Sequence, residues 1–119
     1  MRVQLVDPSA YTPPYDHALA AALARAGADV ELVTSRFLYG PVPREDGYRV
    51  EQYDRLADGM GYDSLARIAR GADCLAILVE HDSVKAELAA DRKAIEAAMR
   101  STLILRFYVP DTAGPPRRA

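Results

Sequence analysis

One stretch of this chain constrains its fold more than any other. Residues 74–79, Cys-Leu-Ala-Ile-Leu-Val, are all apolar, and the polar residues 80–83, Glu-His-Asp-Ser, follow at once. A run of this length with polar flanks is typical of a strand buried on both faces inside a parallel sheet. Asp82 or Ser83 can accept the free backbone N–H groups of a following helix. A buried strand that leads into a capped helix is half of a βαβ unit, so residues 80–83 are expected at the ligand-binding end of the sheet.

Length and composition fit one soluble globular domain. The chain has 119 residues, of which 50% are hydrophobic and 27% charged, and its formal net charge is −2. A chain of this size buries most of the surface that its unfolded form exposes, so we expect one core over residues 1–110. The charge balance gives no reason to expect nucleic acid or a membrane surface as a partner. No apolar run approaches the ~18 residues of a membrane helix, and the N-terminus enters a strand rather than a leader, so a cytoplasmic location is expected.

The first part of the chain predicts one βαβ unit. Residues 2–6 form a strand that Pro8 ends, and residues 29–34 form the next strand. The helix between them takes Pro13 in its first turn and Gly27 as its C-cap. Helical spacing predicts that its inward face carries Tyr15, Ala18, Leu19, Ala22, Leu23 and Ala26.

The rest of the chain predicts further alternation. Residues 35–47 are expected to form a loop, and residues 48–53 a short edge strand. Residues 62–70 are expected to form a short helix with Asp63 or Ser64 as N-cap. One long helix is expected over residues 83–100, and the last strand over residues 102–108. The long helix is expected to bury Val84, Leu88, Ile95 and Met99. Residues 111–119 are rich in Gly, Pro and Arg, so a flexible tail is expected. This order predicts a single Rossmann-like, doubly wound α/β domain with a mostly parallel sheet of four to five strands and helices on both faces.

The expected topology brings two loops together at the carboxyl ends of the strands. If the strand over 74–79 lies beside the strand over 2–6, with 29–34 on the far side, the strand order switches between the first two. Residues 7–12 then face residues 80–83, and two helix N-termini point into one crevice suited to a phosphate or a carboxylate. The candidate ligand-binding residues are Asp7, Tyr11, Thr12, Glu80, His81, Asp82, Ser83 and Arg106.

Each chemically interesting residue also has a purely structural explanation. Asp7 either orients a ribose or caps the following loop, and His81 either binds an anion or satisfies neighbouring backbone groups. Arg106 either binds a phosphate or pairs with a neighbouring acid. His17 is expected to be structural or exposed, because no partner residues stand at metal-ligand spacing. Cys74, the only cysteine, is expected to be buried and unreactive.

The second half of the chain resembles a known family. The segment Ala72-Asp73-Cys74 through Glu80-His81-Asp82, preceded by Ser64-Leu65-Ala66 and Ala69-Arg70-Gly71, resembles the C-terminal, nucleotide-sugar-binding domain of the UDP-glucose/GDP-mannose dehydrogenase family. The likeness covers about residues 60–110, and Arg106 is the one residue kept from the Asp-Gly-Arg-Asn signature of that family.

Residues 10–13 are similar to the Ala-Tyr-Lys-Pro segment of the same family, with Thr12 in place of the lysine. The resemblance implies a UDP- or GDP-sugar as ligand and no covalently bound cofactor. The catalytic cysteine, the lysine and the NAD-binding domain of the family have no counterpart here, so oxidoreductase activity would need another polypeptide.

The first half of the chain resembles a different family. Residues 2–7, 15–27 and 29–37 are similar to the opening βαβ unit of the acceptor-side half of a GT-B glycosyltransferase. The shared features are the helix end Ala-Leu-Ala-Arg-Ala-Gly and the strand end Val-Thr-Ser-Arg, and the likeness weakens after about residue 53. Both resemblances imply a Rossmann-like fold. Neither implies catalysis by this chain alone, because a GT-B enzyme needs a second domain for its donor.

Three function classes therefore stay open. A binding module for a nucleotide-sugar or a similar small anion is the first, since the sharpest motif belongs to such a domain. An enzyme is the second, but the sequence has no nucleophile–base pair, metal-ligand spacing or glycine-rich phosphate loop. A ligand-free scaffold or interaction domain is the third. A homodimer is kept as a partner hypothesis.

Overall fold

The chain folds as a Rossmann-like α/β domain. The computed structural model describes residues 1–7, 10, 13–35, 40, 41, 43, 44, 46–53, 64–78 and 82–107, without the side chains of residues 53 and 83. Its strands are β1 (Arg2–Asp7), β2 (Asp29–Ser35), β3 (Arg49–Tyr53), β4 (Cys74–Ile77) and β5 (Leu103–Arg106). Its helices are α1 (Pro13–Arg25), α2 (Leu65–Ile68), α3 (Asp82–Ala90) and α4 (Arg92–Ala98). The predicted strands are confirmed, with ends that differ by one or two residues.

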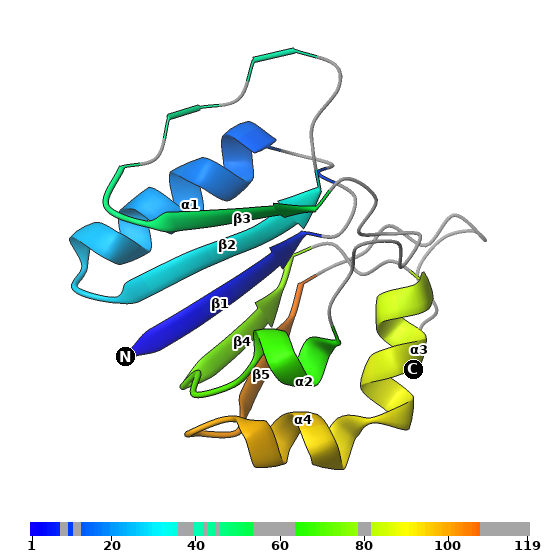
Figure 1. Ribbon diagram of the computed structural model, residues 1–119. Helices are drawn as coiled ribbons and strands as arrows, with labels where there is room; N and C mark the ends of the chain where they lie inside the picture. Colours follow the sequence, from blue (N-terminus) through cyan, green and yellow to red (C-terminus); the bar gives the residue numbers. More distant parts are fainter. Residues whose placement is uncertain are drawn as a thin grey trace, which may run out of the picture.

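The five strands form one parallel sheet in the order β3-β2-β1-β4-β5 (Figure 1). β1 lies between β2 and β4, so the strand order reverses at the β1–β4 pair. β3 is an edge strand, as its partial alternation predicted. The predicted doubly wound topology is therefore confirmed.

Two apolar layers hold the helices to the sheet, one on each face. On one face α1 packs against β1, β2 and β4, and the buried members include Val3, Leu5, Ala20, Leu32 and Ala76. On the other face α2, α3 and α4 pack against β1, β2 and β4, and the buried members include Val6, Leu65, Ile77, Leu88 and Ile95. Because β4 contributes to both layers, all four of its residues are buried, as the apolar run predicted.

The prediction of one helix over residues 83–100 is wrong. α3 ends at Ala90 and α4 begins at Arg92, and the two helices run in different directions (Figure 1). Asp91 between them has φ −112° and ψ 20°, outside the helical range. Neither Gly nor Pro stands at this break. The change of direction at Asp91 lets α4 pack against α2. The four residues that were predicted to be buried, Val84, Leu88, Ile95 and Met99, are buried all the same.

The predicted inward face of α1 is confirmed only at Leu19 and Leu23, which are partly buried against the core. Tyr15 is 57% exposed, and Ala18, Ala22 and Ala26 are exposed as well. The buried residues are instead Pro13, Asp16, His17, Ala20 and Ala21. The helix has alanine on every side, so apolar spacing could not select one face, and the buried His17 has a hydrogen-bonding partner in Tyr48.

The short helix α2 is fixed by hydrogen bonds at its start. The side chain of Ser64 accepts from the backbone N–H of Arg67 at 3.2 Å, which confirms one of the two predicted N-caps. The Oε2 atom of Glu87 in α3 accepts from the backbone N–H of Leu65 at 2.7 Å. α2 is therefore tied to α3 by a charged hydrogen bond as well as by apolar contact. Among the described helices, none is long and apolar enough to cross a membrane. The predicted tail, residues 111–119, lies outside the described residues.

Candidate functional site

The carboxyl ends of β1 and β4 lie side by side. Val6 is in register with Ile77, and the backbone N–H of Leu78 donates to the carbonyl oxygen of Val6 at 2.7 Å. The segments that leave these two strands, residues 8–12 and 79–81, therefore start from the same point of the sheet, at the switch in strand order. In open α/β sheets this is the place where ligands bind.

The structure places four of the eight predicted site residues. Asp7 is the last residue of β1 and is fully buried, and Arg106 is the last residue of β5 and is exposed. Asp82 and Ser83 are the first two residues of α3, and the side chain of Asp82 is exposed. The other four, Tyr11, Thr12, Glu80 and His81, lie outside the described residues. The end of β1, the end of β5 and the start of α3 carry the four described residues, and the ligand-binding role of all eight stays a prediction.

The turn after β1 is tight and strained. The carbonyl oxygen of Asp7 accepts from the hydroxyl of Thr34 at 2.9 Å and from the backbone N–H of Ala10 at 3.3 Å. Ala10 has φ 51°, and it is the one described residue other than glycine with a positive φ. Such a conformation costs about 1 kcal/mol or more, and it persists only where the surroundings hold it.

A buried polar cluster joins α1 to the carboxyl ends of β1 and β2. The cluster consists of Asp16, His17, Thr34, Ser35 and Tyr48, each of which is less than 9% exposed. The Nδ1 atom of His17 lies 2.6 Å from the hydroxyl of Tyr48, and that hydroxyl also donates to the carbonyl oxygen of Arg44 at 3.2 Å. The cavity beside the cluster has about 10 Å³, room for one water, so these residues hold the start of α1 in place rather than enclose a ligand.

Sequence reasoning missed this cluster. It expected His17 to be structural or exposed, and His17 is buried with its ring edge-on to that of Tyr48, at 5.6 Å between ring centroids. The partners come from residues 34, 35 and 48, which no spacing in the sequence connects with the helix. Only the fold brings them together.

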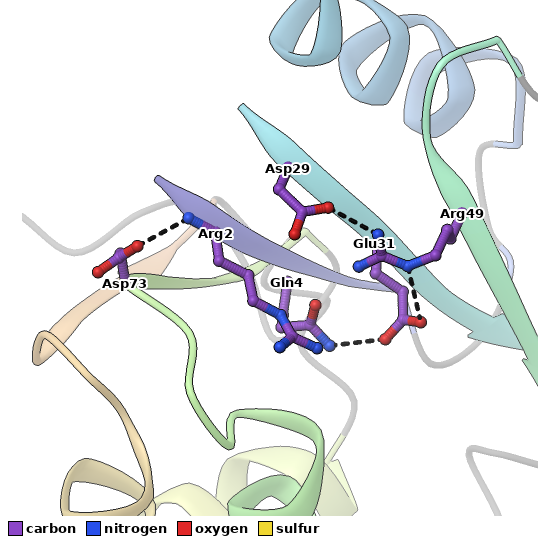
Figure 2. A network of polar contacts seen from close by, with 6 residues as sticks. All are labelled: Arg2, Gln4, Asp29, Glu31, Arg49 and Asp73. Atoms are coloured by element: carbon purple, nitrogen blue, oxygen red, sulfur yellow. Dashed lines mark hydrogen bonds and ion pairs between the residues drawn. The ribbon is translucent and has the colours of Figure 1, made fainter. Parts of the chain in front are cut away.

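A second polar array crosses the amino-terminal half of the sheet, on the face that α2 covers (Figure 2). Arg49 Nη1 donates to Asp29 Oδ1 at 2.6 Å, and Arg49 Nε lies 3.8 Å from Glu31 Oε2. Gln4 Nε2 donates to Glu31 Oε1 at 2.8 Å and to the carbonyl oxygen of Ile68 at 2.9 Å. The array connects β3, β2 and β1 with α2, so most of its charges serve the fold.

The electrostatics of two carboxylates follow from these contacts. The hydrogen bond from Arg49 lowers the pKa of Asp29 below its ordinary value. The backbone N–H of Arg2 and the guanidinium of Arg100 lower the pKa of Asp73 in the same way. In contrast, burial raises the pKa of the Cys74 thiol, which is consistent with the expected inert thiol.

A cleft of about 420 Å³ opens between this array and α2. The polar residues that line it are Arg2, Gln4, Glu31, Glu51, Arg67 and Arg70. None of them was predicted as a site residue, because isolated arginines on helix ends are usually solvated charge. Within the described part of the chain, no group of three or more His, Cys, Asp or Glu side chains is placed to hold a metal ion.

The chain matches no protein-family model, no curated protein and no solved structure. The two family resemblances read from the sequence are therefore expectations that these comparisons do not test.

Proposed function

We propose that this chain is a ligand-binding domain whose ligand is a nucleotide-sugar of the UDP- or GDP-sugar type. The observation that carries the proposal is the switch in strand order between β1 and β4. The switch sets the carboxyl end of β1 beside that of β4, at the edge where Rossmann-like domains bind nucleotides. The resemblance of residues 72–82 to a nucleotide-sugar-binding domain points to the same edge.

Two groups would contact the phosphates. The first turn of α3, at Asp82 and Ser83, supplies free backbone N–H groups and the positive end of the helix dipole. Arg106 supplies a cation from the end of β5. Since Arg106 is in register with Ile77, its side chain leaves the sheet on the face that α3 covers. The segment after Asp7 would close the other side of the ligand.

The proposed role of this chain is binding, without catalysis. A dehydrogenase reaction would need the catalytic cysteine, the lysine and the NAD-binding domain from another polypeptide, because Cys74 is buried within the sheet. A complete GT-B reaction would likewise need a second domain for the donor.

A second candidate, an interaction domain without a small ligand, is favoured by one observation. Leu103 and Leu105 on the edge strand β5, and Phe107 directly after it, are each about two-fifths exposed. An exposed apolar edge strand is a surface to which another strand can add.

Calorimetric titration at low salt tests the proposed function. We expect saturable heat with UDP, GDP or one of their sugar conjugates, and we expect Arg106→Ala to weaken binding at least tenfold, because a charge-assisted contact contributes about 1.5–3 kcal/mol. Arg92→Ala, which removes an exposed arginine from α4, is the matched control and should bind like the unmodified chain.

Two results would contradict the proposal. One is the absence of heat with all of these ligands up to millimolar concentrations. The other is equal affinity of the unmodified chain and Arg106→Ala. Either result would leave the interaction domain as the better candidate.

A further inference from the structure

The cleft beside α2 contains hydrogen-bonding groups that the described fold leaves unsatisfied. Gln4 is 2% exposed, and its Oε1 atom is buried without a hydrogen-bond partner. The Nε atom of Arg2, from the same strand, is also buried without a partner. Buried polar atoms of this kind are rare in folded proteins, and a bound water or a ligand can supply the missing partner.

The orientation of the Gln4 amide is fixed by its neighbours. Its Nε2 atom donates to the Glu31 carboxylate (Figure 2) and to the carbonyl oxygen of Ile68, and both of these groups can only accept. Turning the amide over would set Oε1 against two acceptors. The unsatisfied atom of Gln4 is therefore an acceptor that needs an O–H or N–H donor.

The charges in the cleft point to an anion. Arg2 and Arg70 both line it, and neither guanidinium forms an ion pair or a hydrogen bond in the described structure. Arg2 is held at its backbone N–H by Asp73, so its side chain is free to adjust while its backbone stays in place. The guanidinium of Arg2 lies next to Gly71, the residue that follows Arg70.

We propose that this cleft binds a small hydroxylated oxyanion, a phosphate monoester or a carboxylate that carries a hydroxyl group close to its charge. Arg2 and Arg70 donate to the oxyanion, and Gln4 Oε1 accepts from the hydroxyl. Glu51, exposed on β3 at the far side of the cleft, accepts from a second hydroxyl.

The size of the cleft favours such a ligand over a trapped water. A water occupies about 30 Å³ of liquid volume, whereas small-molecule pockets measure about 300–1,000 Å³. The cleft, with about 420 Å³, falls in the second range. Arg2 is only partly buried as a residue, so rotation of its outer side-chain bonds can turn its donors toward a ligand.

This site is separate from the proposed nucleotide-sugar crevice. The cleft is lined by Arg2 and Gln4 near the start of β1 and by the residues that follow α2, whereas the crevice lies beyond the carboxyl ends of β1 and β4. The two proposals therefore predict different responding residues, and one can fail without the other.

An NMR titration of the ¹⁵N-labelled chain at low salt tests the inference. The probes are glycerol 3-phosphate and glycerate, with methyl phosphate and acetate as matched anions that lack hydroxyls. At least one hydroxylated probe should shift the amide signals of residues 67–71 and of Glu31 saturably, and its matched anion should bind at least tenfold more weakly.

Variants identify the contacts. Arg70→Gln and Arg2→Met should each weaken binding of the hydroxylated probe at least tenfold, and Arg25→Gln on α1 should not change it. Arg70 is exposed, so its replacement keeps the fold intact even if Arg2→Met does not.

Three outcomes overturn the inference. They are the absence of saturation up to about 10 mM probe, equal affinity for the matched anions, and signals that shift only near Asp82 and Arg106 and are lost in Arg106→Ala. The last outcome would support the proposed crevice while removing the cleft as a site.

Discussion

Asp73 connects three parts of the molecule through one carboxylate. It accepts from the backbone N–H of Arg2 at 2.7 Å, at the start of β1, and from two guanidinium nitrogens of Arg100 at 3.0 Å each, after α4. Asp73 itself immediately precedes β4. Its side chain is 13% exposed, whereas that of Arg100 is 72% exposed, so the bond to the backbone of Arg2 is the better shielded of the two contacts. That bond is also the main reason why the pKa of Asp73 is lowered.

The lowered pKa of Asp73 predicts a loss of stability in acid. The folded state holds this carboxylate ionised below its ordinary pKa of 3.8, so the unfolded chain binds more protons there. The stabilisation is complete above about pH 4 and is lost as the pH falls through the lower folded pKa. The pKa of Asp29 is lowered by its hydrogen bond from Arg49, so Asp29 adds to the loss of stability over the same pH range.

Urea unfolding between pH 2 and pH 6 measures the effect. Asp73→Asn should be less stable than the unmodified chain near pH 6, and the difference should shrink below pH 4. Asp91→Asn changes an exposed carboxylate without a capping bond and should follow the unmodified chain throughout. A constant difference between Asp73→Asn and the unmodified chain across the whole range would contradict the role of this carboxylate.

At the scale of single elements, the strands and the four buried residues predicted for residues 83–100 were predictable, whereas most of the inward face of α1 was not. Residues 74–77 are apolar without interruption, and a pattern of that kind has one common structural outcome, a central parallel strand. α1 offered alanines on all sides, and its buried His17 finds its partner in Tyr48, directly before β3. The break at Asp91 follows from the packing of α4 against α2, which local propensity does not encode.

The candidate sites divide in the same way. The edge of the sheet that carries the proposed crevice followed from topology, because strand and helix ends are visible in the sequence as polar clusters. The cleft beside α2 did not, since Arg2 and Gln4 lie far from Arg70 in the chain and none of the three forms a motif. Buried polar groups that meet only in three dimensions leave no local pattern to find.

Two helix N-caps offer a matched test at this scale. The side chain of Ser64 bonds the first turn of α2, whereas the side chain of Asp91 forms no capping bond with α4. Ser64→Ala should therefore lower the free energy of unfolding by about 1 kcal/mol. Asp91→Ala should change it by less than about 0.5 kcal/mol. Chemical unfolding measures both, and equal losses would mean that the Ser64 bond does not contribute.

For the molecule as a whole, the two edges of the sheet differ in character. β3 presents exposed polar side chains, among them Arg49, Glu51 and Gln52. β5 presents Leu103 and Leu105, which are 44% and 42% exposed and lie on the same face of the sheet. Charged residues on an edge strand discourage pairing with another chain, so only the β3 edge is protected in this way.

The unprotected edge predicts self-association through β5. Leu105→Lys should slow aggregation and shift any oligomer toward monomer, at a small cost in stability because the lysine stem still covers its neighbours. Gln52→Lys adds the same charge to the β3 edge and should leave association unchanged. Sedimentation and light scattering at several concentrations measure this, and identical behaviour of the two variants would rule out the β5 edge as the contact.

The central position of β1 also determines the order in which the sheet can form during synthesis. β1 pairs with β2, which follows it closely in the sequence, but its other partner, β4, begins only at Cys74. Arg2 and its hydrogen-bonding partner Asp73 are 71 residues apart in the sequence. A nascent chain can therefore assemble β1, β2 and β3 while the second edge of β1 and the apolar face at Val6 and Val33 stay uncovered. Until β4 is synthesised, that half-sheet is a target for chaperones and for the edges of neighbouring nascent chains.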